Sequence, residues 1–408
     1  MLALLVVGGL AGCGGTGDAA GTPTPGVTTP LATEGAASGA ADPGVAQVHA
    51  LLAAGELRAA RTAADVLAKA QPGALAPRLL QAHTLRYLHD RGGSQTALEA
   101  GYRIAPAGFP ALASYVDHQL RGPNDPKKGL AQLAFLDTHL AAHPGDARLV
   151  AEARLVVTAY LLWQKALTPA DRATTVQIAE ASLLTFTDAT TTDGQYNRAQ
   201  ALLGLGRVDE AVAAARAGIA IDDDRWEGLV MGWAVALLAL HAGDDAGARA
   251  GVAELRGRVE SWEGTHFGMG KPLVELVQLT SALWWGETPP APADHEDRIA
   301  RLARDGARLQ VGDAETRELL RKIMAAREAK DAKTVLAAAD DMLAVVARDG
   351  GCEMENQVIR PHTEVLALVV RADALAALGD ATAAEESLVR ARALFPASAW
   401  LRDRKPTP

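Results

Sequence analysis

A ladder of small residues near the carboxyl end of the chain constrains its fold more than any other feature. Ala372, Ala384 and Pro396 follow one another at intervals of twelve residues, and the pair Gly379-Asp380 lies between the two alanines. Around them, apolar residues recur at three- and four-residue spacing, which is the period of a helix, and alternating β-branched runs are scarce. Residues 365–398 therefore predict two helices that cross closely at their alanines and are joined by a tight turn at the glycine.

The same order of small residues and turn glycine occurs in three other segments of the chain. These ladders are Val48, Leu51, Gly55, Ala60, Ala64, Leu67 and Pro72 near the front; Ala199, Leu202, Gly206, Ala211, Ala215 and Gly218 in the middle; and Ala236, Ala239, Gly243, Asp244, Ala248, Val252 and Leu255 directly after it. The alanines that follow the turn in the last two ladders are 37 residues apart. Weaker copies occupy 77–106, 111–144, 146–187 and 313–348. A recurring interval of this size indicates a repeat array.

These ladders resemble the tetratricopeptide repeat (TPR), a helix-turn-helix unit of about 34 residues with small residues where its helices cross and a proline after the second helix. Leu, Val or Ala replace most of the aromatic residues that the family favours, and the middle ladders lack the final proline. The resemblance implies an all-α fold, a right-handed superhelical array of TPR-like repeats with an extended concave surface. An irregular helical bundle or a related solenoid of helical hairpins is the alternative. Neither fold carries an activity by itself.

The repeat phase also implies which side chains line the concave groove, because the family uses chosen positions of each unit's first helix. Tyr196 and Trp233 occupy equivalent positions, 37 residues apart, and these residue types are frequent in binding hot spots. Core packing is the alternative for both, since an aromatic side chain at helical spacing more often faces the core. The full set of groove residues that we expect to bind a partner is Asp193, Tyr196, Gln200, Val230, Trp233, Leu237 and Asp373.

The amino end of the chain predicts a lipid anchor. Leu10-Ala11-Gly12-Cys13 close an apolar run and resemble the lipobox of bacterial lipoproteins, where the preceding segment is cleaved and the cysteine is acylated. The resemblance implies a signal peptide at 1–12 and a lipidated Cys13. Residues 13–40, rich in Gly, Thr, Pro and Ala, predict a flexible tether. No Lys or Arg precedes the apolar run, so an intracellular TPR adaptor with a fortuitous lipobox is an alternative.

A proline-rich segment divides the rest of the chain. Residues 286–294 contain three prolines, which preclude a helix. We therefore expect an N-terminal TPR-like array at 41–286, a joint at 287–294 and a C-terminal TPR-like array at 295–408. Residues 257–270, with four glycines, Trp262, His266 and Phe267, predict a long loop.

Catalytic motifs are missing from the sequence. It has no Gly-x-Ser-x-Gly elbow, no phosphate-binding loop ending in Lys-Ser or Lys-Thr, and no His-Glu-x-x-His. His139 and His143 could share a metal ion, but no third ligand is evident and a position at a helix end favours capping. Cys352 has no disulfide partner if Cys13 is acylated, and it predicts an inert or partly buried thiol. We expect a protein that is not an enzyme and has no cofactor or metal.

Charge and layout together narrow the function. The net charge is −9 and acidic and basic residues are interspersed, which disfavours nucleic-acid binding. We expect a non-catalytic lipoprotein of the bacterial cell envelope that binds a protein or peptide partner in its groove as a scaffold or assembly factor. Its membrane is expected to be the outer membrane if the cell is Gram-negative. The layout is similar to that of lipoproteins that assist outer-membrane protein assembly or pilus biogenesis. An envelope enzyme or a carbohydrate-binding module on a helical scaffold is the other alternative.

Overall fold

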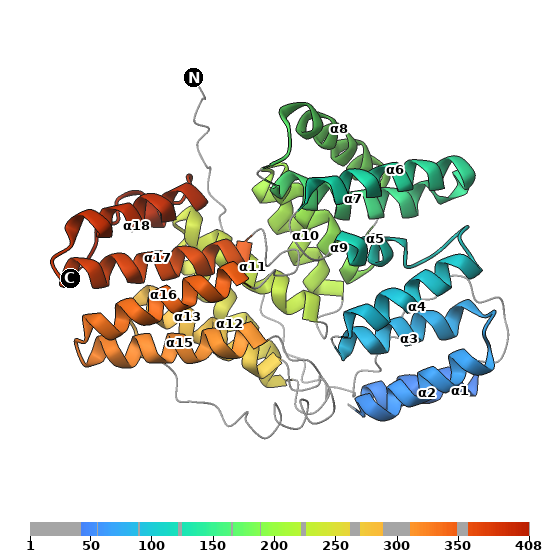
Figure 1. The fold of residues 1–408 in the computed structure, drawn as a ribbon, viewed down its shortest axis with the longest axis horizontal. Helices are drawn as coiled ribbons and strands as arrows, with labels where there is room; N and C mark the ends of the chain where they lie inside the picture. Colours follow the sequence, from blue (N-terminus) through green and yellow to red (C-terminus); the bar gives the residue numbers. More distant parts are fainter. Residues whose placement is uncertain are drawn as a thin grey trace, which may run out of the picture. The chain divides into compact units, whose positions relative to one another are not determined.

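The described part of the chain is built from helices. In the computed structural model, the described residues are 42–54, 56–88, 90–120, 125–164, 166–187, 189–221, 226–261, 270–288, 311–348 and 358–407. Within these ranges the chain forms helices and turns and no strand (Figure 1). The all-α prediction is therefore confirmed. All of these helices belong to one compact unit, Ser38–Pro408.

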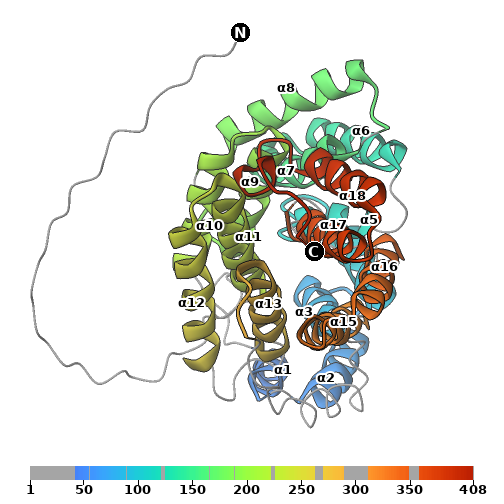
Figure 2. The same ribbon diagram turned by 90° about the vertical axis from the view of Figure 1, so that its left-hand side faces the viewer.

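The helices follow one another in pairs. Those of the first half are α1 (Pro43–Ala53), α2 (Leu57–Ala70), α3 (Leu75–Tyr87), α4 (Arg91–Ile104), α5 (Leu112–Leu120), α6 (Pro126–Ala142), the 3₁₀ turn η1 (Pro144–Asp146), α7 (Ala147–Trp163), α8 (Pro169–Thr185), α9 (Thr192–Gly204) and α10 (Val208–Ile221). Those of the second half are α11 (Trp226–Ala242), α12 (Asp245–Ser261), α13 (Gly270–Trp285), α15 (Val311–Glu328), α16 (Ala332–Arg348), α17 (Arg360–Ala377), α18 (Ala381–Leu394) and α19 (Ala399–Arg402). Neighbours in sequence pack together, among them α3 with α4, α9 with α10, α11 with α12 and α17 with α18. First helices of successive pairs also meet, as α7, α9 and α11 do (Figure 2). This is the arrangement expected of a helical repeat array.

One turn geometry recurs inside these pairs. Gly206, Gly243 and Gly379 end a helix in the left-handed conformation, with φ of 75°, 85° and 88°. In each case the next residue donates its backbone N–H to the carbonyl five positions earlier: Arg207 to Leu202, Asp244 to Ala239 and Asp380 to Leu375, each at 2.9 Å. This closure satisfies carbonyls that the helix leaves unpaired at its end, and glycine takes the left-handed conformation without steric cost. Three of the four turn glycines of the sequence ladders therefore mark helix ends, and the fourth, Gly55, lies outside the described residues.

The second helix of each pair starts in an equally regular way. The carboxylates of Asp90, Asp244, Asp331 and Asp380 each accept a hydrogen bond from the backbone N–H three residues later, at 2.8–3.1 Å. The residue four positions after the one that precedes the second helix is buried in six of these pairs. These residues, each at most 4% exposed, are Ala60, Ser94, Ala211, Ala248, Val335 and Ala384. The ladders predicted small residues at four of these positions, Ala60, Ala211, Ala248 and Ala384. The small side chains let the paired helices approach each other closely.

The hydrophobic core runs along the array as a series of clusters. The largest cluster extends from Ala151 in α7 to Ala374 in α17 and includes residues of α13 and α15, which lie on either side of the expected joint. Glu275 in α13 also pairs with Arg317, at 3.6 Å, and with Arg321 in α15. Residues 289–310 lie outside the described ranges, so the joint at 287–294 stays a prediction.

Candidate functional site: an acidic face on helices α7 and α9

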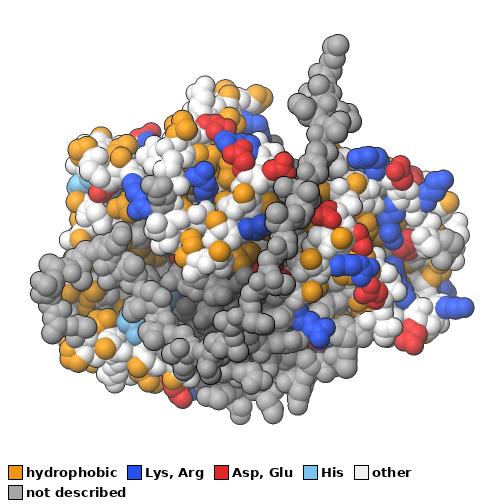
Figure 3. All heavy atoms as spheres, turned by 180° about the vertical axis from the view of Figure 1, so that it is seen from behind, with side chains coloured by type: hydrophobic (Ala, Val, Ile, Leu, Met, Phe, Trp, Pro, Cys, Tyr) orange, Lys and Arg blue, Asp and Glu red, His pale blue; other side chains and the backbone are white. Residues whose placement is uncertain are grey.

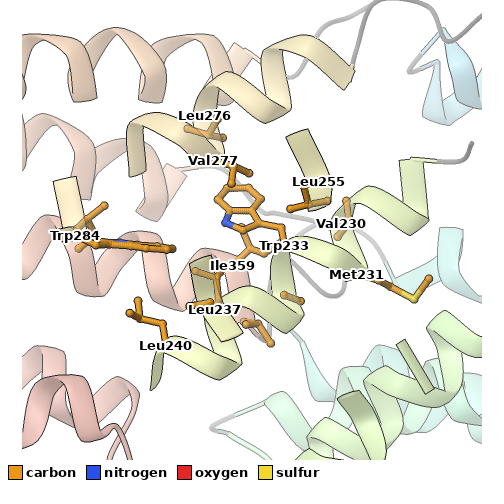
Figure 4. Packing of buried hydrophobic residues seen from close by; sticks show 14 of the residues in the cluster. Val230, Met231, Trp233, Leu237, Leu240, Leu255, Leu276, Val277, Trp284 and Ile359 are labelled. Atoms are coloured by element: carbon orange, nitrogen blue, oxygen red, sulfur yellow. The ribbon is translucent and has the colours of Figure 1, made fainter. Parts of the chain in front are cut away.

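Three of the expected groove residues lie in the hydrophobic core. Val230, Trp233 and Leu237 of α11 are 2%, 3% and 0% exposed. Figure 4 shows the indole of Trp233 directly beside Val277 of α13, with Leu276 and Leu255 nearby. The expectation that these residues face a partner is wrong for this structure, because α13 packs over this side of α11. Burying an aromatic ring contributes about 1.5–3 kcal/mol, which favours covering it.

The groove prediction for α9 is wrong for two residues and open for the third. Tyr196 is 7% exposed and belongs to the same core cluster, and Gln200 is 2% exposed. Neither is an exposed contact residue, because the side of α9 that carries them packs into the array. Asp193, in the first turn of α9, is only half-buried. Of this group, Asp193 alone offers its side chain to the solvent.

Asp193 lies beside a second carboxyl group that the sequence did not single out. The amide nitrogen Nδ2 of Asn197, one helical turn after Asp193, donates a hydrogen bond to Oε1 of Glu152 in α7, at 3.3 Å. Burial and the nearby negative charge of Asp193 raise the pKa of Glu152 to about 7, against the opposing effects of the Asn197 hydrogen bond and the Arg148 charge. We refer to Glu152, Asp193 and Asn197 as the acidic face.

The acidic face is suited to binding a positive charge. Near neutral pH, Glu152 is divided between its protonated and ionised forms, and a cation placed against it would favour the ionised form. Perturbed carboxyl pKa values of this kind gather at functional sites. No group of three His, Cys, Asp or Glu side chains in the described ranges is placed to hold a metal ion. The acidic face therefore carries one to two negative charges, from Asp193 and Glu152, and the amide of Asn197.

The seventh expected groove residue, Asp373 of α17, is covered by the end of the chain. It is 8% exposed and accepts hydrogen bonds from Arg327 Nη2 at 2.9 Å, from Arg404 Nη2 at 3.3 Å and from the backbone N–H of Thr407 at 2.9 Å. The expectation that Asp373 is open to a partner is wrong here, because residues 403–407 already occupy its polar atoms.

The two histidines considered as metal ligands have structural contacts with protein groups instead. His139 Nδ1 bonds the hydroxyl of Tyr102 at 2.8 Å, and its Nε2 lies 2.9 Å from Asp146 Oδ2. With both ring nitrogens engaged, His139 has no lone pair free for a metal. His143 is the C-cap residue of α6 and donates its backbone N–H to the carbonyl of His139. The Tyr102 ring stacks on Tyr115, with ring centroids 5.1 Å apart, so this network holds an aromatic cluster in place.

A buried polar chain joins residues that are far apart in the sequence. His241 of α11 bonds Ser398 Oγ through Nδ1 at 2.8 Å and His362 Nδ1 of α17 through Nε2 at 2.9 Å. Burial lowers the pKa of His241 to about 4, and burial together with the nearby His241 lowers the pKa of His362 well below its usual value. Trp284 packs edge-on against His362, with 4.4 Å between the ring centroids. No local sequence pattern predicts these hydrogen bonds, because His241, His362 and Ser398 are 36 to 157 residues apart in the sequence.

A polar cavity of about 410 Å³ lies on another part of the array, between α2, α3 and α4. Its charged groups are largely paired with one another: Arg61 lies 3.9 Å from Asp65 and 3.7 Å from Asp90, and Gln81 donates to Asp65 at 2.7 Å. Glu152 and Asp193 are not among its lining residues.

Several expected features lie outside the described residues. These are the lipobox and Cys13, the tether, Cys352 and the loop residues Trp262, His266 and Phe267. The loop expected at 257–270 begins later than predicted, because residues 257–261 belong to α12. On the face shown in Figure 3, acidic and basic side chains are intermixed over the atoms that are coloured by type. Among the described helices, none is both long enough and apolar enough to span a bilayer.

Comparison with known proteins adds no identification. No protein-family model matches the chain, and no curated protein matches it.

Proposed function

We propose that this chain is a lipid-anchored, non-catalytic scaffold of the bacterial cell envelope, whose TPR-like array binds a protein or peptide partner. The recurrence of one turn geometry, one capping interaction and one buried small residue in successive helix pairs is the observation that carries the proposal. Stacked helix pairs of this kind present an extended surface on which an elongated partner binds, and they do so without a catalytic centre. A right-handed TPR superhelix is part of the proposal.

The acidic face is the part of that surface that we assign to the partner. A basic segment laid across α7 and α9 would place a Lys or Arg against Asp193 and Glu152, with the Asn197 amide as a further polar contact. Charge complementarity of this sort speeds association and selects among partners.

The anchor is the second part of the proposal and rests on the sequence. Leu10-Ala11-Gly12-Cys13 followed by a tether rich in Gly, Thr and Pro is the order that a surface lipoprotein requires. Two or three acyl chains on Cys13 hold a protein stably at a membrane, whereas a single chain gives only marginal binding. The tether would then let the helical array reach a partner away from the lipid surface.

Site-specific photo-crosslinking tests the partner site. A photoreactive residue replaces Asp193 in the full-length protein in cells, and a matched protein carries it at Asp209, another acid in the first turn of a helix. We expect a discrete crosslinked species from position 193 that is weakened by Glu152→Gln and absent from position 209. Equal crosslinking at both positions, or none at 193, would contradict the assignment of the acidic face.

A further inference from the structure

The last segment of the chain is held like a bound peptide. After α19 ends at Arg402, residues 404–407 have no regular secondary structure, and they run across α17 and α18. We call residues 403–407 the strap. Its main chain is gripped on both sides: Arg392 Nη2 of α18 donates to the carbonyl of Arg404 at 2.8 Å, and the Thr407 N–H donates to Asp373 Oδ1 at 2.9 Å. Side chains that bind main-chain groups recognise any extended peptide, whatever its sequence.

One side chain of the strap adds specificity. The Arg404 guanidinium bonds Asp373 Oδ2 at 3.3 Å and lies over the Trp400 ring, 5.4 Å from its centroid. Asp373 also holds Arg327 at 2.9 Å. Without the strap, this buried carboxylate would keep only the Arg327 contact out of three, and a buried carboxylate that lacks donors is costly. The site is therefore complete only when an extended chain with a positive charge lies in it.

The strap fills this site imperfectly. Nε of Arg404 is buried without a hydrogen-bond partner in the described part of the chain. Asp403, Lys405 and Thr407 are exposed, so the strap buries little apolar surface. Its hold depends on a few polar contacts and on its covalent connection, which supplies an effective concentration in the millimolar range. A separate peptide with the same contacts and a better fit would displace it.

We propose that the strap is a built-in ligand, occupying a peptide-binding site formed by Asp373, Arg327 and Arg392, and that an arginine-bearing extended segment of the partner takes its place. The inference rests on the proposed scaffold function and gives that function a second contact point. The repeat phase placed Asp373 in the groove, and in the structure the same residue binds an extended segment of chain. Binding at this site requires the strap to leave, which makes the strap an autoinhibitory element.

Peptide binding in trans tests the proposal. The probe is a fluorescein-labelled peptide with the sequence of residues 403–408, and the protein is the full chain, either wild type or with Arg404→Ala. We expect saturable binding by fluorescence anisotropy to the Arg404→Ala chain, because its own strap has lost the guanidinium contact. Binding to the wild-type chain should be about tenfold weaker or more, because the intact strap competes at millimolar effective concentration.

Control variants make the outcome decisive. Asp373→Asn added to the Arg404→Ala chain should abolish binding, whereas Asp340→Asn, at an exposed ion pair with Arg371, should leave it unchanged. In the full chain, hydrogen exchange of the Thr407 amide should be slow and should accelerate in Arg404→Ala. Absence of probe binding to the Arg404→Ala chain, or equal binding to this variant and to the wild-type chain, would overturn the proposal. Either result would leave crosslinking at Asp193 intact, so failure of the strap and failure of the scaffold function are distinguishable.

Discussion

Replacing Glu152 by Gln should stabilise the protein at alkaline pH and leave its stability almost unchanged at acidic pH. The unfolded carboxyl titrates at 4.5 and the folded one at about 7, raised by burial and by Asp193. Between these values the folded chain binds more protons than the unfolded chain, so stability falls as the pH rises from 4.5 to 7. One pKa unit corresponds to about 1.4 kcal/mol, and a shift of this size makes the native state about 3 kcal/mol less stable above pH 7 than below pH 4.5. Glutamine keeps a hydrogen-bonding oxygen for Asn197 and removes the charge.

Urea unfolding at pH 5 and pH 8 measures this effect. The free energy of unfolding of Glu152→Gln should exceed that of the wild type by up to about 3 kcal/mol at pH 8, and the difference should shrink toward zero at pH 5. Asp193→Asn should give a smaller gain of the same sign, because it removes one cause of the raised pKa. Glu180→Gln, at an exposed pair with Arg207, is the control and should show no such pH dependence. A Glu152→Gln protein that is less stable than the wild type at pH 8 would refute the assigned environment of this carboxyl.

Four further outcomes follow from the sequence and the structure. Cys13→Ser should release the protein from membranes and stop palmitate incorporation, whereas identical fractionation of mutant and wild type, both with an intact Met1 terminus, would exclude the lipoprotein assignment. Ala384→Phe should destabilise the α17–α18 pair by about 1–3 kcal/mol in urea unfolding, because Ala384 is fully buried at the helix crossing, and the exposed Ala381 is the control position. Trp233→Ala should cost about 3–5 kcal/mol and lower the melting temperature without a specific loss of partner binding, in keeping with its 3% exposure. The protection of α17 amides against hydrogen exchange, corrected for the intrinsic exchange rate at each pH, should fall as the pH is lowered from 6.5 to 4. Unfolded His241 titrates near 6.5 and folded His241 at about 4, so the unfolded chain binds more protons in that window and the folded state loses stability.

The sequence predicted the local geometry of the pairs well, because that geometry depends on neighbouring residues. The left-handed backbone conformation at a helix end favours glycine, as at Gly206 and Gly379. A close helix crossing favours a small side chain, as at Ala248 and Ala384. In the pair α15–α16, Lys330 takes the left-handed conformation, with φ of 53°, and no turn glycine marks this helix end in the sequence. The segment around Lys330 was accordingly among the weak copies of the ladder.

The sequence was a poor guide to which faces of the first helices are exposed. Trp233 and Tyr196 occupy equivalent positions of α11 and α9, as the 37-residue interval predicted, yet both are buried. Each residue advances a helix by about 100°, so a small rotation of α11 turns a groove position into a core position. The neighbour that decides the outcome, α13, comes more than 35 residues after Trp233 and carries no ladder of its own. The sequence did not predict the His241–His362 hydrogen bond for the same reason, because it joins separate helix pairs.

The apolar residues expected in the groove are buried, so a partner that binds at the groove positions would have to be held by charged side chains. Of the expected groove residues, the two acids behave differently from the apolar ones: Asp193 stays half-buried beside Glu152, and Asp373 is reached by an arginine and a main-chain N–H of an extended segment. Both acids would bind positive charge on an extended chain, and the chain as a whole carries a net charge of −9. A partner that binds along this array is therefore expected to present basic side chains from a flexible segment, and its affinity should fall as salt is raised, because screening weakens contacts between exposed charges. A partner held by apolar anchors would bind equally well in high salt.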